Sequence, residues 1–436
     1  MLVAPDLSLN SDILSGADKC VKCGLCHPGC PTYVLSLNEN EAPRGRIALM
    51  QALAGGQLKP SPPVLTHLDH CLTCRACEHV CPSGVPFGAL IDATRILLEP
   101  VRQRPRAARL LRRLALTLVR RPALRAVVTT LLRFYQQRPG LRARVAGSSF
   151  LARRPQLRRL ESMLPSWHRK PAPASTTAEP RGRIALFAGC TGRVLEPAAL
   201  DATRRVLTHL GYEVVTPRRQ TCCGALHLHA GEREAALTLA RHNLRVFAAA
   251  RADAVIYTAS GCGAQLREYD TLFAGEPKDN AAENLGVTPV GICEFLTGIP
   301  WPEAVTLRPL ARRVAIHEPC SLRNVLRSED AVYRLLGRIP QIRLEPLPDN
   351  ALCCGAAGSY MLSEPQWADA IVDRKLARLA ESDAVSPEII VSSNVGCAVH
   401  LRNGLRRRGV EVEVMHPVEL LCEQLEEASS EERGAR

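Results

Sequence analysis

Two cysteine-rich stretches near the start of the chain share one spacing. In CVKCGLCHPGCP and again in CLTCRACEHVCP, four cysteines follow one another at intervals of three, three and four residues, and a proline closes the run. Thiolates are soft metal ligands, and this many on two short loops indicate metal binding rather than ordinary packing. The cysteines are Cys20, Cys23, Cys26 and Cys30 in the first stretch and Cys71, Cys74, Cys77 and Cys81 in the second.

This spacing is that of the bacterial ferredoxin run that ligates [4Fe–4S] clusters. In two-cluster ferredoxins the fourth cysteine of each run ligates the cluster of the other run, so each run completes its partner. Zinc also accepts four thiolates, but zinc sites usually pair two short Cys-x2-Cys hooks and do not need two reciprocal runs. We therefore predict two [4Fe–4S] clusters. Their ligands are Cys20, Cys23, Cys26 and Cys81 for cluster 1, and Cys71, Cys74, Cys77 and Cys30 for cluster 2.

The second half of the chain carries three cysteine landmarks twice. RIALFAGC, a Cys-Cys-Gly and TASGCG are followed, at offsets of 130, 131 and 135 residues, by RVAIHEPC, a second Cys-Cys-Gly and SSNVGC. Three landmarks at nearly one offset indicate an internal duplication. The cysteines are Cys190, Cys222, Cys223 and Cys262 in the first copy and Cys320, Cys353, Cys354 and Cys397 in the second.

Three interpretations of these eight cysteines stay open: a further iron–sulfur cluster, a quinone or redox-active thiol site, and a structural metal or reduced core thiols. Cys293 and Cys422 lie in apolar helical surroundings and are expected to be ordinary buried thiols. Nearby histidines are able to relay protons to a quinone, but the sequence favours a structural role for them, so no catalytic residue is predicted. These histidines are His227, His229 and His317.

The elements that must position the second set of cysteines alternate between strand and helix. In each copy three β-rich runs, such as IALFAG and AVIYTAS, are separated by helical runs such as EREAALTLARHNLRVFAAA. This alternation predicts α/β units with a mostly parallel sheet, whose carboxyl edge collects the landmark cysteines. Between the two N-terminal runs, RGRIALMQALAGG predicts one helix with a Gly-Gly stop.

The chain is therefore expected to be an α+β multidomain protein. The predicted domains are a helical two-[4Fe–4S] ferredoxin-like domain at 1–98, an Arg-rich helical connector and linker at 99–180, and duplicated α/β cysteine-rich domains at 181–305 and 306–436. The connector contains helices broken at Pro105, Pro122 and Pro139, followed by the linker PAPASTTAEP at 171–180.

Positive charge is concentrated in this connector. The whole chain carries +13, whereas residues 101–170 hold 18 Arg, one Lys and one Glu and so carry +18. Arg alternates with Leu and Val at helical spacing in LLRRLALTLVRR, as in helices that lie on an anionic bilayer surface or dock on an acidic partner. The alternative is that these arginines only form a solvent-exposed face of the linker. Nucleic acid is not predicted as a partner because aromatic interleaving and known binding modules are lacking.

Several sequence motifs that would indicate other classes of protein are missing from this chain. The start of the chain lacks a secretory signal pattern, and no run of about 18 uncharged apolar residues predicts a membrane-spanning helix. In a reducing compartment clustered cysteines are metal ligands or redox groups more often than disulfides. The glycine-rich motifs for dinucleotides and nucleotides are also missing. A chain with two clusters and no substrate-oxidising cofactor is most simply an electron-transfer subunit.

The motifs together resemble the family of bacterial glycolate oxidase iron–sulfur subunits over nearly the full chain. The segments that carry the resemblance are CVKCGLCHPGCPTY, APRGRIALM, HLDHCLTCRACEHVCPSGV, QTCCGALHLH, TASGCGAQLREY, HEPCSLRNV, LCCGAAGSY and SNVGCAVHL. The duplicated half is similar to the paired cysteine-rich, or CCG, domains of heterodisulfide reductases and flavin-linked oxidoreductases. The fullest form of that motif ends in Cys-x2-Cys, whereas this chain has Gln265 and His400 at the final positions.

The resemblance implies a subunit that oxidises no substrate alone. It implies two flavoprotein-type partner subunits that hold the FAD, oxidation of glycolate to glyoxylate by the complex, and electron delivery to quinone or the respiratory chain. It also implies a peripheral location on the cytoplasmic side of the inner membrane. Equivalent subunits of lactate or anaerobic glycerol-3-phosphate dehydrogenases, and a heterodisulfide reductase-like thiol–disulfide reductase, are the alternatives.

Overall fold

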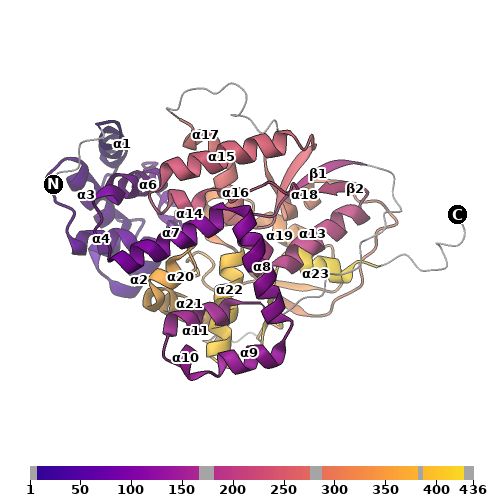
Figure 1. Cartoon of the computed structure of the whole chain (residues 1–436). Helices are drawn as coiled ribbons and strands as arrows, with labels where there is room; N and C mark the ends of the chain where they lie inside the picture. Colours follow the sequence, from indigo (N-terminus) through magenta and orange to yellow (C-terminus); the bar gives the residue numbers. More distant parts are fainter. Residues whose placement is uncertain (1–6, 166–180, 275–286, 382–385, 427–436) are drawn as a thin grey trace, which may run out of the picture.

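The N-terminal domain is a small helical body (Figure 1), and its cysteine runs lie in loops except for Cys77, which is in the short helix Ala76–His79. The computed structural model describes residues 7–165, 181–274, 287–381 and 386–426. Buried Ile13, Met50, Leu68 and Ile91 form the core of this domain. The elements are α1 (Leu7–Asp18), α2 (Pro31–Ser36), η1 (Glu39–Glu41), α3 (Pro43–Ala54), α4 (Pro62–Asp69), α5 (Ala76–His79), α6 (Phe87–Leu98) and η2 (Glu99–Val101). The helix predicted between the runs is α3, which ends at Ala54, directly before Gly55, as expected.

Each copy of the duplicated half folds around a four-stranded parallel sheet. The strand orders are β2-β1-β3-β4 and β6-β5-β7-β8, and every strand pair is parallel. The prediction of two α/β units with parallel sheets is thus confirmed, and the short strands β4 and β8 are additions to it. The first copy contains β1 (Gly182–Phe187), α12 (Gly192–Leu195), α13 (Pro197–His209), β2 (Tyr212–Val215), α14 (Ala225–Leu228), α15 (Arg233–Ala248), β3 (Ala254–Tyr257), α16 (Ser260–Arg267), α17 (Tyr269–Leu272), β4 (Val290–Gly291) and α18 (Ile292–Gly298).

The second copy repeats this plan. Its elements are β5 (Arg313–His317), η3 (Ser321–Leu326), α19 (Asp330–Leu336), β6 (Arg343–Pro346), α20 (Tyr360–Ser363), α21 (Pro365–Glu381), β7 (Ile389–Ser392), α22 (Val395–Arg407), β8 (Glu413–Met415) and α23 (Pro417–Gln424). The two copies exchange their last helices, because α18 packs on α19 of the second copy and α23 packs on α13 of the first. Their buried residues therefore form one shared core, which includes the predicted buried thiols Cys293 and Cys422.

The Arg-rich connector is helical, as predicted. It contains α7 (Arg106–Arg120), α8 (Pro122–Gln136), α9 (Pro139–Ala146), α10 (Ser149–Ala152) and α11 (Pro155–Met163). Proline begins α8 and α9 because its missing N–H and fixed φ suit the first turn of a helix. The predicted linker at 171–180 lies outside the described residues.

Several connector arginines face inward rather than forming one solvated face. Arg102 pairs with Asp69 of α4 at 2.5 Å, and Arg112 Nη1 lies 3.0 Å from Glu232 of the first copy. Arg159 pairs with Asp369 of α21 at 2.7 Å, and Arg125 is buried with Nη2 donating to Gln220 O. The connector is thus fastened to all three neighbouring domains.

Candidate iron–sulfur sites

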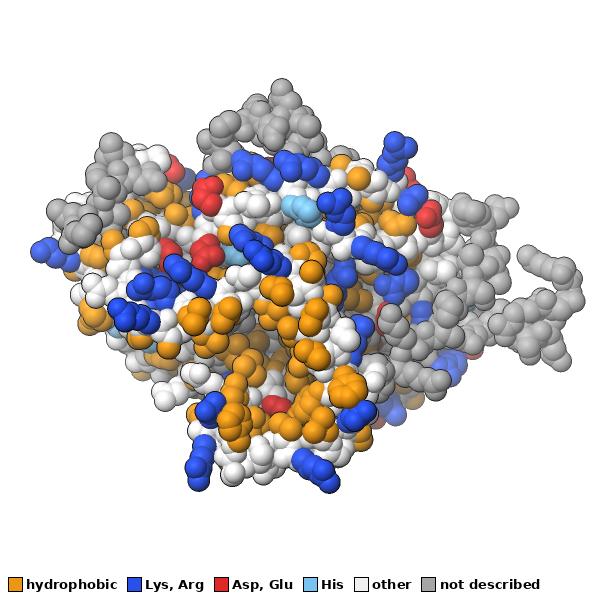
Figure 2. Space-filling view, viewed as in Figure 1, with side chains coloured by type: hydrophobic (Ala, Val, Ile, Leu, Met, Phe, Trp, Pro, Cys, Tyr) orange, Lys and Arg blue, Asp and Glu red, His pale blue; other side chains and the backbone are white. Residues whose placement is uncertain are grey.

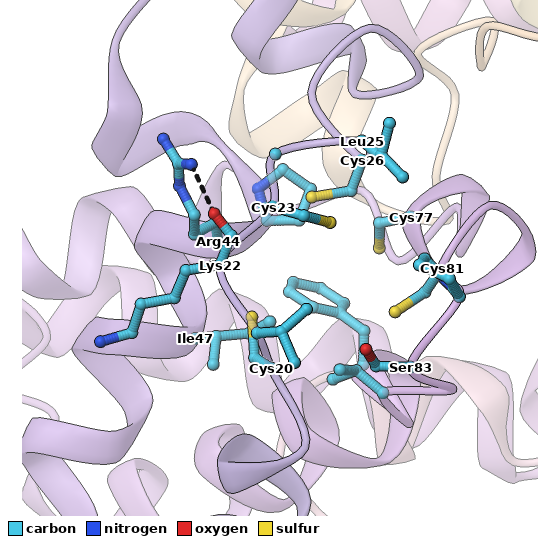
Figure 3. Close-up of a pocket in the computed structure, with 16 residues that line it drawn as sticks. Cys20, Lys22, Cys23, Leu25, Cys26, Arg44, Ile47, Cys77, Cys81 and Ser83 are labelled. Atoms are coloured by element: carbon cyan, nitrogen blue, oxygen red, sulfur yellow. Dashed lines mark hydrogen bonds between the residues drawn. The ribbon is translucent and has the colours of Figure 1, made fainter.

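The four predicted ligands of cluster 1 line one pocket. Figure 3 shows their sulfur atoms turned toward a common space, with Cys77 beside them. The loop reaches this shape because Lys22 and Gly24 adopt positive φ values of 58° and 82°, which fold the backbone around the thiols. Arg44 Nη1 donates to Lys22 O over 2.8 Å and holds the loop from outside. The ligands that line the pocket are Cys20, Cys23, Cys26 and Cys81.

The four predicted ligands of cluster 2 also lie together. Burial raises the pKa of the Cys77 thiol well above its ordinary value, and its neighbours Cys74, Cys71 and Cys30 raise it further. Cys77 is thus the member of the second quartet that also lines the pocket of the first, while it stays close to the other three cysteines of its own quartet. Crowded, partly buried thiols hold their protons unless a cation binds, and a bound metal deprotonates them outright. Both quartets therefore fit an iron–sulfur cluster by donor type and grouping.

The quartet predicted to bind cluster 2 has a buried cation beside it that sequence reasoning did not single out. Arg46 of α3 is 1% exposed, and its Nη1 lies 3.9 Å from Cys30 Sγ. Its Nη2 donates to Glu41 Oε2 over 2.6 Å, and its Nε donates to His67 O over 2.7 Å. The guanidinium is therefore fixed where it offsets negative charge on the cysteine ligands. The motif PRGR contains this residue, but only the fold shows which Arg turns inward.

Glu41 is the centre of this network. Its Oε1 lies 2.6 Å from His67 Nδ1 and 2.9 Å from His70 Nδ1. Burial acts to raise the pKa of Glu41, but the hydrogen bonds from His70 and His67 and the charge of Arg46 hold it below its ordinary value. The carboxylate therefore remains ionised beside cluster 2.

In the first copy the four landmark cysteines gather at the carboxyl edge of the sheet. Cys190 Sγ lies 3.5 Å from Cys222 Sγ, and the Cys262 thiol is close enough to Cys223 to raise the pKa of Cys223. The hydrogen bond to Cys222 and burial raise the pKa of Cys190 well above its ordinary value. The predicted grouping is thus present in the fold, with Cys190 after β1 and Cys262 in α16 after β3.

The second copy repeats the grouping and adds an imidazole. Cys353 Sγ lies 3.9 Å from Cys320 Sγ, and Cys354 Sγ lies 3.0 Å from Cys397 Sγ. The ligand atoms of His317, Cys354 and Cys397 all lie within 4.8 Å of one another, and the three residues are buried. The sequence assigned His317 a structural role, so its place among the thiols is a finding of the fold.

The glycine of each Cys-Cys-Gly is required by backbone geometry. Gly224 and Gly355 have φ values of 98° and 88°, where L side chains are strained. A Cβ on Gly355 would also lie 2.8 Å from Ala368 O of α21. The close approach of helix and loop keeps the adjacent cysteines at the sheet edge.

The final thiols of the full CCG motif are replaced by residues with other contacts. His400 Nε2 lies 2.9 Å from Ala368 O, and burial lowers the pKa of His400 to about 4. Gln265 is buried at the corresponding place in the first copy. Of the other singled-out histidines, His229 Nδ1 lies 3.0 Å from Asp92, and His227 is buried with its pKa lowered by desolvation.

The N-terminal domain and the second copy meet at Cys74. Asn324 of η3 donates from Nδ2 to Cys74 O over 2.8 Å. Burial raises the pKa of the Cys74 thiol, and Cys320 is the neighbouring thiol that adds most to this shift. Cys74 and Cys320 also pack against the buried cluster that contains Cys353, Cys354 and Cys397. The quartet predicted to bind cluster 2 is therefore adjacent, through Cys74, to the cysteines of the second copy.

Comparison with known proteins matches the segments that contain these cysteines to two domain families. Residues 16–85 match the 4Fe-4S dicluster domain, and residues 184–267 and 314–402 each match the Cysteine-rich domain, CCG, which confirms the duplication. These segments lie inside three of the four predicted domains, whose boundaries stay predictions.

Relatives extend over almost the whole chain. The chain is 34% identical to the glycolate oxidase iron-sulfur subunit of Escherichia coli (strain K12) over 424 residues, covering 93% of this chain and 94% of that protein. It is 33% identical to the probable glycolate oxidase iron-sulfur subunit of Bacillus subtilis (strain 168) over 417 residues, covering 93% of each. Lactate utilization protein A of Geobacillus sp. (strain WCH70) is 28% identical over 240 residues, covering 55% of this chain and 98% of that protein. The chain therefore belongs to the family of glycolate oxidase iron–sulfur subunits.

Proposed function

We propose that this chain is the electron-transfer subunit of a flavin-dependent glycolate oxidase complex. The observation that carries the proposal is the pair of reciprocal cysteine quartets, one of which abuts the cysteines of the second CCG copy. Two [4Fe–4S] clusters in the quartets would accept the electron pair from a flavin one electron at a time. The chain's own residues hold, space and electrostatically tune these centres. Glycolate itself would bind at the flavin in a partner subunit.

The surface beside cluster 1 suits the docking of a flavoprotein partner. Val21 and Leu25, in the loop that carries three cluster ligands, are 68% and 60% exposed. Leu37 and Val80 are further exposed apolar side chains of the same domain. Exposed apolar groups beside a redox centre favour a partner that covers them and brings its cofactor close. We assign electron entry to this side and exit to the buried side at Cys74.

The acceptor side is proposed to be quinone or another component of the respiratory chain at the membrane. Among the described residues no helix has the length and apolar character needed to cross a bilayer. The connector instead has an exposed apolar face, and Figure 2 shows apolar side chains over the region of α7, α8 and α11 with Lys and Arg at their margin. Its large apolar residues, 50 to 65% exposed, are Leu110, Leu111, Leu114, Val127, Leu131, Phe134 and Phe150.

An anionic bilayer surface is the occupant that this face fits best. The segment 101–170 carries +18, and apolar helices edged by Arg lie at the boundary between lipid headgroups and acyl chains. We therefore propose a peripheral location on the cytoplasmic side of the inner membrane.

A lactate-oxidising complex is the second candidate. The observation that favours it is the similarity to lactate utilization proteins over 55% of this chain. An equivalent role with anaerobic glycerol-3-phosphate dehydrogenase would use the same residues and another flavoprotein. Thiol–disulfide reduction is less well supported, because Gln265 and His400 stand where the full motif has thiols.

The test uses the complex with its flavoprotein subunits, assayed with glycolate, lactate and glycerol-3-phosphate. We expect glycolate to reduce quinone through the unmodified complex, whereas Cys23→Ser and Cys74→Ser each abolish quinone reduction and leave the flavin reducible. Cys293→Ser, a buried thiol outside the quartets, is the matched control. Unchanged iron content and activity in both cluster variants would overturn the assignment, and reduction only by lactate or glycerol-3-phosphate would reassign the substrate.

A further inference from the structure

A buried tyrosine hydroxyl beside the second quartet makes no hydrogen bond within the protein. Tyr360 is the first residue of α20 in the second CCG copy, and only 5% of it is exposed. Its hydroxyl oxygen is buried and has no hydrogen-bond partner among the residues that the structure describes. Buried polar groups are nearly always hydrogen-bonded, because burying one without a partner costs free energy. The Tyr360 hydroxyl therefore indicates an acceptor other than a protein group.

The start of α20 packs against the segment that carries Cys71, a predicted ligand of cluster 2. Leu72, the next residue in the chain, belongs to the same buried apolar cluster as Tyr360. On the other side of Cys71, His70 Nε2 lies 3.6 Å from Oε2 of Glu364, which follows α20 directly. Both chain neighbours of Cys71 are thus in contact with the part of the second copy that contains Tyr360.

The surroundings of the hydroxyl keep it a donor. Burial raises the pKa of Tyr360 above its ordinary value, so the side chain holds its proton. The charges that act on it come from Glu364, Arg46, Glu41 and Cys71. Neither carboxylate accepts its hydrogen, and both oxygens of Glu41 are already engaged, by Arg46 and by two imidazoles. The one neighbour that is also a predicted cluster ligand is Cys71, so the sulfur atoms of cluster 2 are the acceptors that suit this donor.

The first CCG copy has a different residue at the matching place. Counted from the glycine of each Cys-Cys-Gly, the fifth residue is His229 after Gly224 and Tyr360 after Gly355. His229 Nδ1 lies 3.0 Å from Oδ1 of Asp92 in α6. In both copies this residue therefore meets the N-terminal domain, but the imidazole finds a carboxylate there and the hydroxyl finds no protein acceptor.

We infer that Tyr360 donates a hydrogen bond to a sulfur atom of cluster 2 and thereby raises the midpoint potential of that cluster. Hydrogen bonds to the sulfurs are among the factors that set the potential of an iron–sulfur cluster. Reduction adds negative charge to the cluster, and a donor binds more strongly to a more negative acceptor, so the bond favours the reduced form. The inference rests on the proposed function, which places cluster 2 in this quartet, and adds to it a residue of the second copy that tunes the potential.

The chain offers a matched control for Tyr360→Phe. Tyr257 is 2% exposed, and its hydroxyl likewise has no hydrogen-bond partner in the described part of the chain. The charges that act on Tyr257 come from Arg267, Glu294 and Cys293, none of which is a predicted ligand of either N-terminal cluster. Tyr360→Phe and Tyr257→Phe each remove one buried oxygen atom and leave the ring in place, so they differ only in which site loses a hydroxyl.

The first experiment is a redox titration of the full chain, purified anaerobically and followed by electron paramagnetic resonance, with iron measured in each sample. The signal of cluster 2 is assigned by its loss in Cys74→Ser. We expect equal iron contents, a lower midpoint potential of cluster 2 in Tyr360→Phe, and no change in Tyr257→Phe or in cluster 1. An unchanged potential in a Tyr360→Phe chain that holds both clusters would overturn this inference alone. Absence of a cluster 2 signal from the unmodified chain would overturn it together with the cluster assignment.

A second experiment separates a hydrogen bond from a change in packing. In D2O an exchangeable hydrogen that bonds to a reduced cluster is detected as a deuterium coupling in pulsed electron paramagnetic resonance. We expect Tyr360→Phe to lose one such coupling to cluster 2 and Tyr257→Phe to lose none. A potential that falls in Tyr360→Phe while every deuterium coupling persists would assign the shift to packing and contradict the hydrogen bond.

Discussion

Asn324 of the second CCG copy donates a hydrogen bond from Nδ2 to the backbone carbonyl of Cys74, a predicted ligand of cluster 2, over 2.8 Å. The amide is nearly buried, and it fixes the distance between the N-terminal domain and the cysteines around Cys320. Two domains that are far apart in sequence therefore meet at the point where electrons would leave cluster 2.

Asn324→Ala is expected to loosen this contact. Loss of one largely buried hydrogen bond costs about 1 kcal/mol, and Cys74 O is left without its donor. We predict faster removal of iron from cluster 2 by a chelator, with cluster 1 unaffected, measured by the decay of the cluster 2 signal in electron paramagnetic resonance. Asn38→Ala, at an exposed turn, is the control. Equal chelation rates in the unmodified chain and in Asn324→Ala would show that the contact does not protect the site.

Arg46→Met is predicted to destabilise the N-terminal domain by about 3 kcal/mol, because it leaves the buried Glu41 carboxylate without its guanidinium partner. It should also lower the midpoint potential of cluster 2, since a positive charge near Cys30 is lost. Denaturant titration and potentiometry measure the two effects.

Arg44→Met provides the matched control for Arg46. Arg44 pairs with the half-exposed Glu39 at 2.7 Å, and such exposed ion pairs contribute about 0–1 kcal/mol. Its hydrogen bond to Lys22 O lies at the cluster 1 loop, so Arg44→Met is expected to leave the potential of cluster 2 unchanged. Equal effects of the two substitutions would argue against a special role for the buried pair.

Membrane binding is predicted to need both charge and apolar surface. Arg113 and Arg121 are exposed on the connector. Removing two such charges weakens binding to anionic vesicles by about 2 kcal/mol, or about 30-fold, and replacing each by a Glu that the anionic surface repels weakens it further. Arg113→Glu/Arg121→Glu should therefore reduce co-sedimentation with phosphatidylglycerol vesicles, and more so at low salt. Leu111→Ser/Leu131→Ser should reduce it at every salt concentration.

The control for membrane binding is Arg343→Glu/Arg374→Glu, which makes the same charge change at exposed positions outside the connector. Arg112 is unsuitable for this test because its ion pairs with Glu99 and Glu232 hold the fold together. Undiminished sedimentation of both connector variants would instead favour a partner protein or a solvated surface.

Acid is predicted to destabilise the duplicated half through His416. Burial lowers the pKa of His416 to about 4, and its Nε2 lies 3.0 Å from Thr258 O of the first copy. The pKa of His416 is about 6.5 in the unfolded state. Between that value and its folded pKa only the unfolded state takes up the proton, so the free energy of unfolding decreases as the pH is lowered. At pH 5 the expected loss relative to pH 7 is about 2 kcal/mol from this residue.

His416→Asn should flatten this pH dependence, because Asn keeps a helix N-cap and does not titrate. The measurement is calorimetric unfolding between pH 5 and 7, with exposed His79→Asn as the control. An unchanged acid slope in His416→Asn would exclude His416 as its source.

The sequence predicted the parts of the fold that depend on local pattern. Reciprocal cysteine runs, prolines that break the connector into separate helices, and the repeated order of strand, Cys and Cys-Cys-Gly all act through short-range geometry, and the corresponding elements are present. The grouping of Cys190 with Cys222 and of Cys354 with Cys397 followed from the rule that parallel strands end at one sheet edge.

Long-range contacts were beyond sequence reasoning. The inward turn of Arg46 and Arg112, the exchange of last helices between copies, and the contact of Asn324 with Cys74 depend on which surfaces pack together. His317 was singled out but assigned a structural role, because one residue in β5 does not show its distance to thiols encoded many residues later. Aligning the two copies at Cys190 and Cys320 would have shown that Phe187 of the first copy stands where the second copy has His317.

The central claim is that electrons from glycolate enter this chain through its cysteine-ligated clusters. The most direct measurement mixes the anaerobic complex with glycolate, freezes it within milliseconds to seconds, and records electron paramagnetic resonance alongside flavin absorbance. The account predicts that signals of reduced [4Fe–4S] clusters appear as the flavin is reoxidised, and that Cys74→Ser removes the cluster 2 signal while cluster 1 is still reduced. A flavin that is reduced and reoxidised by quinone while both clusters stay oxidised would contradict the account.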